Sequence, residues 1–204
     1  MRTFQITIAS QGPMLWGRQI NDTDRPQTTS KGDFEQERWR ERMLSDEDGT
    51  PMLPNLAINN CLTEAAKALR KTIPGRGKSE YGAVFARALV PPYKDVRLDV
   101  DIQDVKPVTM FVPSDGKKGG GKRVNRVFAH IDNWKATFQV VALDNAITQE
   151  IMEEVANYAS MCIGFGAMRP GNKNCGQCGR FKVVSIEETQ SDALGFELPE
   201  EAVA

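Results

Sequence analysis

The sequence predicts an α+β fold of the ferredoxin-like kind, in which two helices cover one face of an antiparallel sheet. Three observations predict it. Strand-like alternation opens the chain, and amphipathic helical patterns follow at about 55–73 and 147–162. Strand patterns stand between these helices and after the second one, which gives the split βαβ order. The remaining residues form a long insertion after the first strand and an extra β-hairpin.

Composition favours one globular domain. The chain has 204 residues, 40% of them apolar, and a net charge of −1. No apolar run reaches the ~20 residues of a membrane-spanning helix, and the N-terminus reads into a strand without a signal segment, so we expect a cytoplasmic protein with no membrane partner. We place a single domain at 1–187, with its insertion at about 17–51 and its hairpin at about 106–131. We expect the acidic residues 188–204 to form a flexible tail.

The first half of the chain contains one strand and one long helix. Residues 3–10 alternate strictly between polar and apolar side chains, which predicts a half-buried strand. The polar insertion carries a short helical pattern near 34–44. Asn55 is expected to cap the long helix, and Pro74-Gly75 follows it as a stop signal. The apolar stripe of this helix consists of Ile58, Leu62, Ala65, Leu69 and Ile73.

The second half is richer in strands. A short helix is predicted at 79–90, before Pro91-Pro92, and residues 96–102 have the clearest strand alternation in the chain. Further strand patterns occupy 107–112, 123–131, 136–143 and 180–186. The first two of these predict a hairpin. The nearly continuous apolar run at 136–143 predicts a strand that is buried on both faces.

A glycine-rich, basic segment runs from Ile163 to Val183, between the second helix and the last strand. It contains no acid, and its cations are Arg169, Lys173, Arg180 and Lys182. Free N–H groups and cations at such a turn suit a bound phosphate backbone. A glycine C-cap followed by a solvated loop fits the same residues.

The hairpin also has a basic tip. Between 105 and 126 the chain has six Lys or Arg residues and one acid. The candidate phosphate-binding cations are Lys117, Lys118, Lys122, Arg123 and Arg126. A solvated loop that keeps the protein soluble is the alternative. Among the aromatic residues, Trp134 is the first candidate to stack on a base.

The cysteines and the single histidine offer weaker candidates. Without a signal segment, a disulfide framework is not expected, and Cys61 and Cys162 fall on apolar helix faces. Cys175 and Cys178 have metal-ligand spacing, but a structural zinc site needs a further pair of ligands, so we expect no cofactor. His130 is the candidate general acid or base for RNA cleavage, although a packed strand histidine fits the same position.

Two segments of the chain resemble the RAMP superfamily, the RRM-like proteins that include the backbone subunits of CRISPR effector complexes. Residues 52–66 resemble the family's proline-led entry into its first helix, although no Gly-Ser follows Pro54 and no Lys-Gly pair lies in the helix. Residues 163–183 resemble the glycine-rich loop that the family places between its last helix and last strand. The long arms and the lack of a second domain also look like stand-alone, virus-borne relatives, including those of phage.

The resemblance implies a protein that coats single-stranded nucleic acid, usually RNA, with DNA left open as a ligand, as a homo-oligomer or filament. Gly164 and Gly166, with Arg169 and Arg180, would face the strand, and the basic hairpin would act as a thumb-like arm. Other subunits of a ribonucleoprotein are further expected partners. The setting would be a prokaryotic host or a virus-infected cell.

Three hypotheses for the function follow. The first is a non-enzymatic, single-stranded nucleic-acid-binding protein of RRM-like fold that self-associates along the strand. The second is a metal-independent RNA-processing endonuclease of the same fold, which would use His130. The third is a structural or inhibitory module that binds another protein.

Overall fold

The computed structural model describes residues 1–114, 122–171 and 176–189 and contains a four-stranded antiparallel sheet of order β4-β8-β1-β9. Its strands are β1 (Arg2–Ser10), β4 (Leu89–Val90), β8 (Lys135–Ala142) and β9 (Phe181–Thr189). Helix α2 (Asn55–Leu69) lies between β1 and β4 in sequence, and α4 (Gln149–Tyr158) lies between β8 and β9. This is the α+β, ferredoxin-like arrangement that the sequence predicted.

Alternating side chains divide the two faces of this sheet. Phe4, Ile6 and Ile8 of β1 are at most 1% exposed, and each pairs with an apolar residue of β8. Residues of β8 alternate between exposed and buried along the whole strand, so only one of its faces is covered. The prediction that 136–143 is buried on both faces is therefore wrong. The apolar run at 136–143 looked continuous because it includes Val141, which is only partly buried, and Leu143, which lies beyond the strand.

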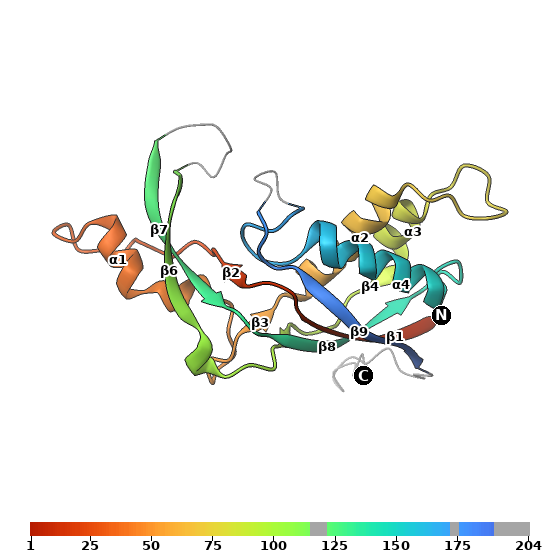
Figure 1. The fold of residues 1–204 in the computed structure, drawn as a ribbon, viewed down its shortest axis with the longest axis horizontal. Coiled ribbons are helices and arrows are strands. Elements are labelled where there is room, and N and C mark those ends of the chain that lie inside the picture. The colour runs from red at the N-terminus through yellow and green to blue at the C-terminus, as the bar shows by residue number, and fades with distance from the viewer. Residues whose placement is uncertain (115–121, 172–175, 190–204) are drawn as a thin grey trace, which may run out of the picture.

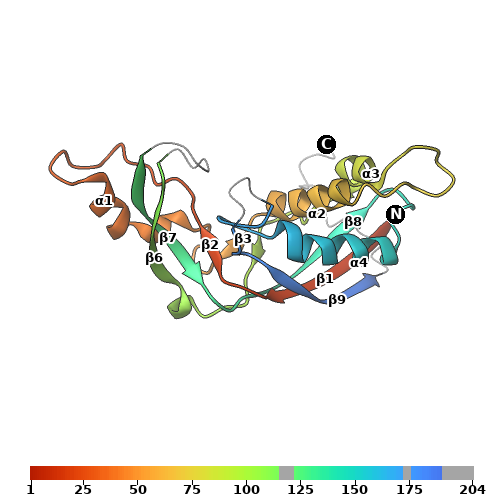
Figure 2. The same cartoon turned by 45° about the horizontal axis from the view of Figure 1, so that its top comes forward.

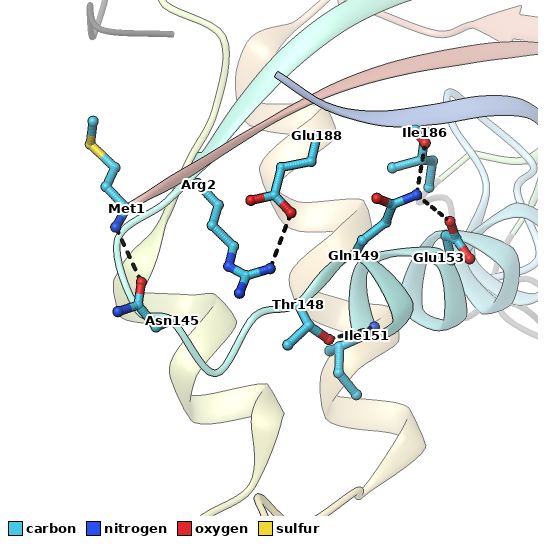
Figure 3. Close-up of polar contacts among 9 residues, drawn as sticks. All are labelled: Met1, Arg2, Asn145, Thr148, Gln149, Ile151, Glu153, Ile186 and Glu188. Carbon is cyan, nitrogen blue, oxygen red and sulfur yellow. Dashed lines mark hydrogen bonds and ion pairs between the residues drawn. The ribbon is translucent and has the colours of Figure 1, made fainter. Parts of the chain in front are cut away.

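Helices α2, α4 and α3 (Tyr81–Ala88) lie together on one side of the four-stranded sheet (Figure 2). Thr148 caps α4 by accepting a hydrogen bond from the backbone N–H of Ile151, and Gln149 Nε2 donates to the carbonyl of Ile186 on β9 at 3.3 Å (Figure 3). After Tyr158, α4 continues as a π-helical turn (Ala159–Ile163) that leads into the glycine-rich segment. None of the helices in the described part of the chain combines the length and apolar character needed to cross a membrane.

The start of α2 differs from the prediction. Pro54 occupies the N-cap position, and Asn55 is the first helical residue. The side chain of Asn55 donates instead to the carbonyl oxygens of Pro92 and Tyr93, at 3.2 and 3.3 Å. At the other end the helix stops at Leu69, because Arg70 adopts a left-handed backbone with φ 50°.

A second, three-stranded sheet lies at the other end of the molecule and has the order β2-β7-β6 (Figure 1). It consists of β2 (Met14–Trp16), β6 (Lys106–Pro113) and β7 (Arg123–Ile131), and β6 and β7 pair as the predicted hairpin. Strand β2, which the sequence did not predict, follows β1 after the turn at Gly12-Pro13. In the same way β7 leads into β8, so the second sheet extends the first beyond a bend.

The insertion after β2 packs against this second sheet. It contains α1 (Lys31–Glu37) and a 3₁₀ turn (Trp39–Arg42), and both contact β7. Phe34 and Trp39 are buried, and Gln36 accepts a hydrogen bond from Thr109 of β6 at 3.2 Å. One face of the hairpin is therefore covered by the insertion.

The clearest predicted strand, 96–102, is mostly absent. Only β5 (Val96–Arg97) is a strand, and it pairs with β3 (Met52–Leu53). Leu98 is buried but its backbone N–H donates to the carbonyl of Pro51, Asp99 makes an isolated bridge to Lys135, and a 3₁₀ turn (Ile102–Asp104) follows. Residues 98–102 therefore alternate in burial along a bent chain that has no continuous strand partner among the described residues.

Candidate nucleic-acid interface

The hairpin β6–β7 presents two faces with different surroundings. Residues paired directly across an antiparallel ladder lie on the same face, so Met110, Val112, Phe128 and their partners form the inner face. Val112 and Phe128 are buried in a small apolar cluster with Leu15 of β2. Ala167, Met168 and Cys178 of the glycine-rich segment pack against this cluster. The inner face is thus occupied by protein.

The outer face of the hairpin carries an exposed aromatic ring near its tip. Phe111 is 60% exposed and lies opposite Asn125 in the ladder. The guanidinium carbon of Arg123 lies 5.5 Å from the centroid of the Phe111 ring. An exposed ring beside a cation provides both a stacking surface for a base and a charge for its phosphate.

Three cations of the predicted basic hairpin lie in the described residues. Lys122 and Arg123 are exposed, and Arg126 is partly buried with its Nη2 donating to the carbonyl of Ser114 at 3.1 Å. Within the described ranges no carboxylate lies within 4.0 Å of any of the three. Their charge is therefore available to a polyanion. Lys117 and Lys118, which the sequence also placed at this tip, lie outside the described residues.

The glycines of the segment after α4 serve its own packing. Gly164, Gly166 and Gly179 all have positive φ, between 69° and 74°. A Cβ at Gly179 would overlap the carbonyl oxygen of Phe165, and one at Gly166 would overlap that of Leu15. These close contacts hold the segment against β2.

Several backbone N–H groups of the glycine-rich segment are already used. Phe165 donates to the carbonyl of Gly179 at 2.9 Å, Ala167 to Leu15 at 2.7 Å and Gly179 to Pro13 at 2.7 Å. Gly164 donates to Ala159 at 2.9 Å. These groups cannot also cradle a phosphate, so the structure favours the packing interpretation of this segment over the phosphate loop that the resemblance implied.

The cations of this segment are held differently from those of the hairpin. Arg169 Nη1 forms an ion pair with Glu64 Oε2 of α2 at 3.1 Å. Arg180 is partly buried, and its Nε is a buried donor without a hydrogen-bond acceptor among the described residues. Lys173 lies outside them. Arg169 and Arg180 therefore support the loop more than they face solvent.

Trp134, the predicted stacking residue, is a core residue. It is 3% exposed, and its ring makes an edge contact with Phe165 at 6.3 Å between centroids. Its Nε1 donates to the carbonyl of Gly12 at 3.3 Å. No ring face is accessible to a base, which contradicts the stacking role predicted for Trp134. The aromatic residue that the sequence analysis missed is Phe111, and the register of 107–112 was the signal that could have identified it.

The histidine and the cysteines were the weaker candidates from the sequence. His130 Nε2 lies 3.5 Å from Asp132 Oδ1, and the His130 side chain is 18% exposed. Burial raises the pKa of the Cys178 thiol, and Cys175 lies outside the described residues. Burial also raises the pKa of the Cys61 thiol to about 12, which makes it unreactive. In the described ranges no group of three or more His, Cys, Asp or Glu side chains is placed to hold a metal ion.

The face of the four-stranded sheet away from α2, α3 and α4, which we call the open face, is polar in the described chain. It carries Gln5, Thr7, Thr137 and Gln139, which pair across β1 and β8, and the two threonine hydroxyls lie 3.0 Å apart. The aromatic residues of this sheet in the described chain all point to the helix-covered face. These are Phe4, Phe138 and Phe181, each at most 6% exposed. The open face therefore offers no ring on which a base could stack.

Comparisons with known proteins identify similar folds but no family. No protein-family model matches the sequence, and no curated protein matches it. The chain is similar to a subunit in the cryo-EM structure of the Type III-B Cmr-beta complex bound to cognate target RNA, with 11% identity and a TM-score of 0.46 over 92% of this chain and 60% of that one. It is also similar to Cmr6 from Pyrococcus furiosus, with 12% identity and a TM-score of 0.48 over 89% of this chain and 97% of that one.

Both structural neighbours carry a Cmr name. The chain spans less than two thirds of the first one's length. Because both identities are near 11% and both TM-scores lie below 0.5, we rest the proposals below on the chain's own residues. A virus-borne origin stays a prediction.

Proposed function

We propose that this protein binds single-stranded nucleic acid on the outer face of the β6–β7 hairpin. The observation that carries the proposal is the exposed Phe111 ring beside Arg123, next to cations without carboxylate partners in the described chain. A single strand offers unpaired bases for Phe111 and phosphates for Arg123 on the same face and for Lys122 at the tip, whereas Arg126 pairs with Met110 on the inner face. Binding of this kind tracks the backbone and reads few bases.

Following the sequence resemblance, we propose RNA as the ligand ahead of DNA, with no catalytic step. We also propose that copies self-associate along the strand, alone or with other subunits of a ribonucleoprotein. Exposed apolar side chains at the start of α2 support this part of the proposal. Leu56 is 64% exposed and Tyr93 is 73% exposed, and the hydrogen bonds of Asn55 to Pro92 and Tyr93 hold the two segments together. Such a patch suits contact with a neighbouring subunit.

The salt dependence of binding tests the hairpin directly. We predict that the double variant Lys122→Ala, Arg123→Ala binds a single-stranded oligonucleotide more weakly for every sequence. The slope of log K against log salt should flatten by about 1.4, since each phosphate contact contributes about 0.7 on a single strand. Fluorescence anisotropy across a salt series measures both quantities for matched RNA, DNA and duplex.

The matched control is Lys135→Ala, Lys182→Ala. These exposed lysines flank Ala9 on the open face of the four-stranded sheet, so the same charge is removed elsewhere. The control should leave the slope within experimental error of the wild type. Equal losses of affinity in both double variants would show that only the total charge of the protein matters. That result would overturn the proposed site. Light scattering before and after nuclease treatment tests self-association on the same preparations.

A further inference from the structure

A cavity of about 530 Å³ lies beside the start of α2. Four segments that are distant in sequence line it: β2 and the residues after it, the end of the 3₁₀ turn, the start of α2, and the glycine-rich segment. Ala167 lines the cavity and also packs against the apolar cluster of Val112 and Phe128, so the cavity adjoins the inner side of the hairpin. An occupant of the cavity therefore leaves free the outer face of the hairpin, where the strand is proposed to bind.

The cavity has an apolar floor and a rim that is open to solvent. Met14, Trp16 and Leu53 are buried residues of its lining. Gly17 and Gly166 also line it, and both are exposed, so the cavity opens on their side. Its volume falls within the range of about 300–1,000 Å³ that is typical of ligand sites. An apolar hollow of this size indicates a docking site, since a protein rarely leaves so much apolar surface uncovered.

One arginine at the rim adds a charge to the site. Arg18 lines the cavity and is exposed. Within the described ranges no carboxylate lies within 4.0 Å of its side-chain nitrogens. Arg42, the other arginine of the lining, is 2% exposed and is already paired with Glu35. A matching occupant therefore has apolar side chains for the floor and a carboxylate for Arg18.

The chain itself contains a segment of this composition. Residues 190–204 lie outside the described part of the structure, and they contain no Lys, Arg or His but four acids, Asp192, Glu197, Glu200 and Glu201. Among them, Leu194, Phe196 and Leu198 stand at every second residue. A peptide with this spacing that binds in extended form presents its three apolar side chains on one side and the intervening Glu197 on the other. The segment thus has both features that the cavity requires.

Distance prevents these apolar residues from filling the cavity of their own chain. Strand β9 runs from Phe181, which pairs with Ser10, to Thr189 at the far end of the sheet, about 26 Å away. The cavity begins at Met14, beyond Ser10, so it lies on the side away from the end of β9 (Figure 1). Phe196 is seven residues past Thr189, and seven residues span at most about 25 Å even before the chain reverses its direction.

We propose that the cavity takes residues 194–198 of a second copy of this chain. The inference rests on the proposed function, because it names the contact through which copies self-associate. One copy supplies the segment after β9 and the next supplies its cavity, so a pair still has one unused segment and one unused cavity, and the contact repeats head to tail. The cavity also adjoins the patch proposed for subunit contact, since Ala57 of its lining is next to Leu56 in α2.

The test removes each half of this contact from the full chain, after nuclease treatment. A tail variant, Leu194→Ser, Phe196→Ser, Leu198→Ser, loses the apolar side chains, and a cavity variant, Ala57→Leu, fills the cavity from α2. Light-scattering chromatography over a concentration series should show wild-type assemblies larger than a dimer and both variants as monomers. Asn60→Leu, at an exposed position of the same helix, is the matched control for the cavity variant and should assemble like the wild type.

Mixing the two variants tests the head-to-tail geometry and shows that each one still folds. The cavity variant has an intact segment and the tail variant an intact cavity, so the mixture should form a one-to-one pair that grows no further. A fluorescent peptide of residues 190–204 should bind the tail variant, and adding Ala57→Leu to that variant should weaken binding roughly ten-fold or more, since apolar side chains lose their burial. Adding Arg18→Ala should weaken it about two- to five-fold, the usual effect of one surface ion pair.

The outcomes are separable from those of the hairpin. A wild type that stays monomeric at every concentration, or assemblies that both variants leave unchanged, would overturn the head-to-tail contact, while the hairpin site is measured on the monomers. Assemblies that both variants dissolve, in a protein that ignores single strands, would support the contact and overturn the hairpin. A monomeric wild type that copurifies with another protein, released by Ala57→Leu, would overturn the second copy as the occupant.

Discussion

The two sheets of this protein are joined through β1–β2 and β7–β8, yet they present opposite kinds of surface. The four-stranded sheet has one face buried under helices and one open face of threonine and glutamine. The three-stranded sheet is covered on one face by the insertion and on the other by the glycine-rich segment, and it exposes Phe111 and Arg123 near the hairpin tip. The open sheet face is broad but carries no described aromatic ring on which a base could stack. The hairpin carries such a ring, Phe111, on a much smaller surface.

The difference shows that exposed aromatic side chains need not lie on the sheet that defines the fold. A ferredoxin-like sheet can present aromatic residues to a single strand. Here its described aromatic side chains are all used in the core, so the face has none left for a ligand. The chemistry instead lies on an addition to the fold, which the glycine-rich segment holds in place. Function has to be argued from the residues of the site.

Breaking the glycine-rich segment should have the largest effect. We predict that Gly179→Ala lowers the free energy of unfolding by roughly 3 kcal/mol, because a left-handed backbone costs a side chain about 1–2 kcal/mol and the overlap with the Phe165 carbonyl adds about 1–3 kcal/mol. The backbone of Gly179 donates to Pro13 and accepts from Phe165, so a displaced backbone at this residue would also weaken the support of the hairpin. Urea denaturation measures the stability, and hydrogen exchange should show β2 losing protection before β1 does.

Gly75→Ala is the matched control for this change. Gly75 has φ 77°, close to that of Gly179, but a Cβ there would have no neighbour within 4 Å. Only the backbone strain of about 1 kcal/mol should appear. If both variants lose the same free energy of unfolding, the close packing around Gly179 contributes nothing to stability. The glycine-rich segment would then not hold the three-stranded sheet in place as we describe.

Removing the exposed ring should have a smaller and more local effect. We predict that Phe111→Ala weakens binding of a single strand by about 1–3 kcal/mol, the usual contribution of one stacked base, and leaves stability nearly unchanged because the ring is largely exposed. Phe111→Tyr should retain most of the affinity. Anisotropy titrations at fixed salt measure these changes.

Thr137→Ala on the open sheet face is the comparison for Phe111→Ala. It removes a hydroxyl hydrogen bond with Thr7 but no ring and no charge. Strand affinity should stay at the wild-type value. A loss equal to that of Phe111→Ala would move the binding surface to the four-stranded sheet and reverse the comparison.

The sequence predicted the parts of the fold that depend on local periodicity. The strand at 3–10, both long helices and the hairpin all lie where alternating or helical patterns placed them, because one side of each element is buried. The prediction of a strand at 96–102 was mostly wrong, because alternation indicates burial and does not show that a hydrogen-bonded partner strand exists. Asp99 makes only an isolated bridge. Strand β2 was missed because three residues are too few for a pattern.

The candidate site was harder to predict because its surroundings come from distant segments. Strand alternation places Phe111 and Val112 on opposite faces of the hairpin, but the packing of Met168, more than 50 residues later, decides which of the two is exposed. Trp134 is the opposite case. The sequence predicted an exposed ring, but Phe165 and Phe181, which are distant in sequence, pack against it. Arg42 and Glu35 lie in a charged insertion that the sequence pattern indicates is solvated, and only the folded chain buries them as an ion pair.

The smallest effect should come from the far end of the first sheet. Arg76, in the loop between α2 and α3, makes two hydrogen bonds to Asp144, at 2.7 and 2.9 Å, and these hold the pKa of Asp144 near 2, below its ordinary value of 3.8. A carboxylate with a lowered pKa in the folded state stabilises the protein fully above pH 3.8, and this contribution is lost as the pH falls toward 2.

Arg76→Ala should flatten the pH dependence of stability in that window, by a small amount because the pair is at the surface. Strand affinity at neutral pH should not change, since helices α2 and α3, which the loop containing Arg76 connects, lie away from the β6–β7 hairpin (Figure 1). Thermal melts between pH 2 and pH 5, together with one anisotropy titration, would measure both. A variant that loses strand binding here would show that the two regions are coupled, and the division on which the hairpin proposal depends would fail.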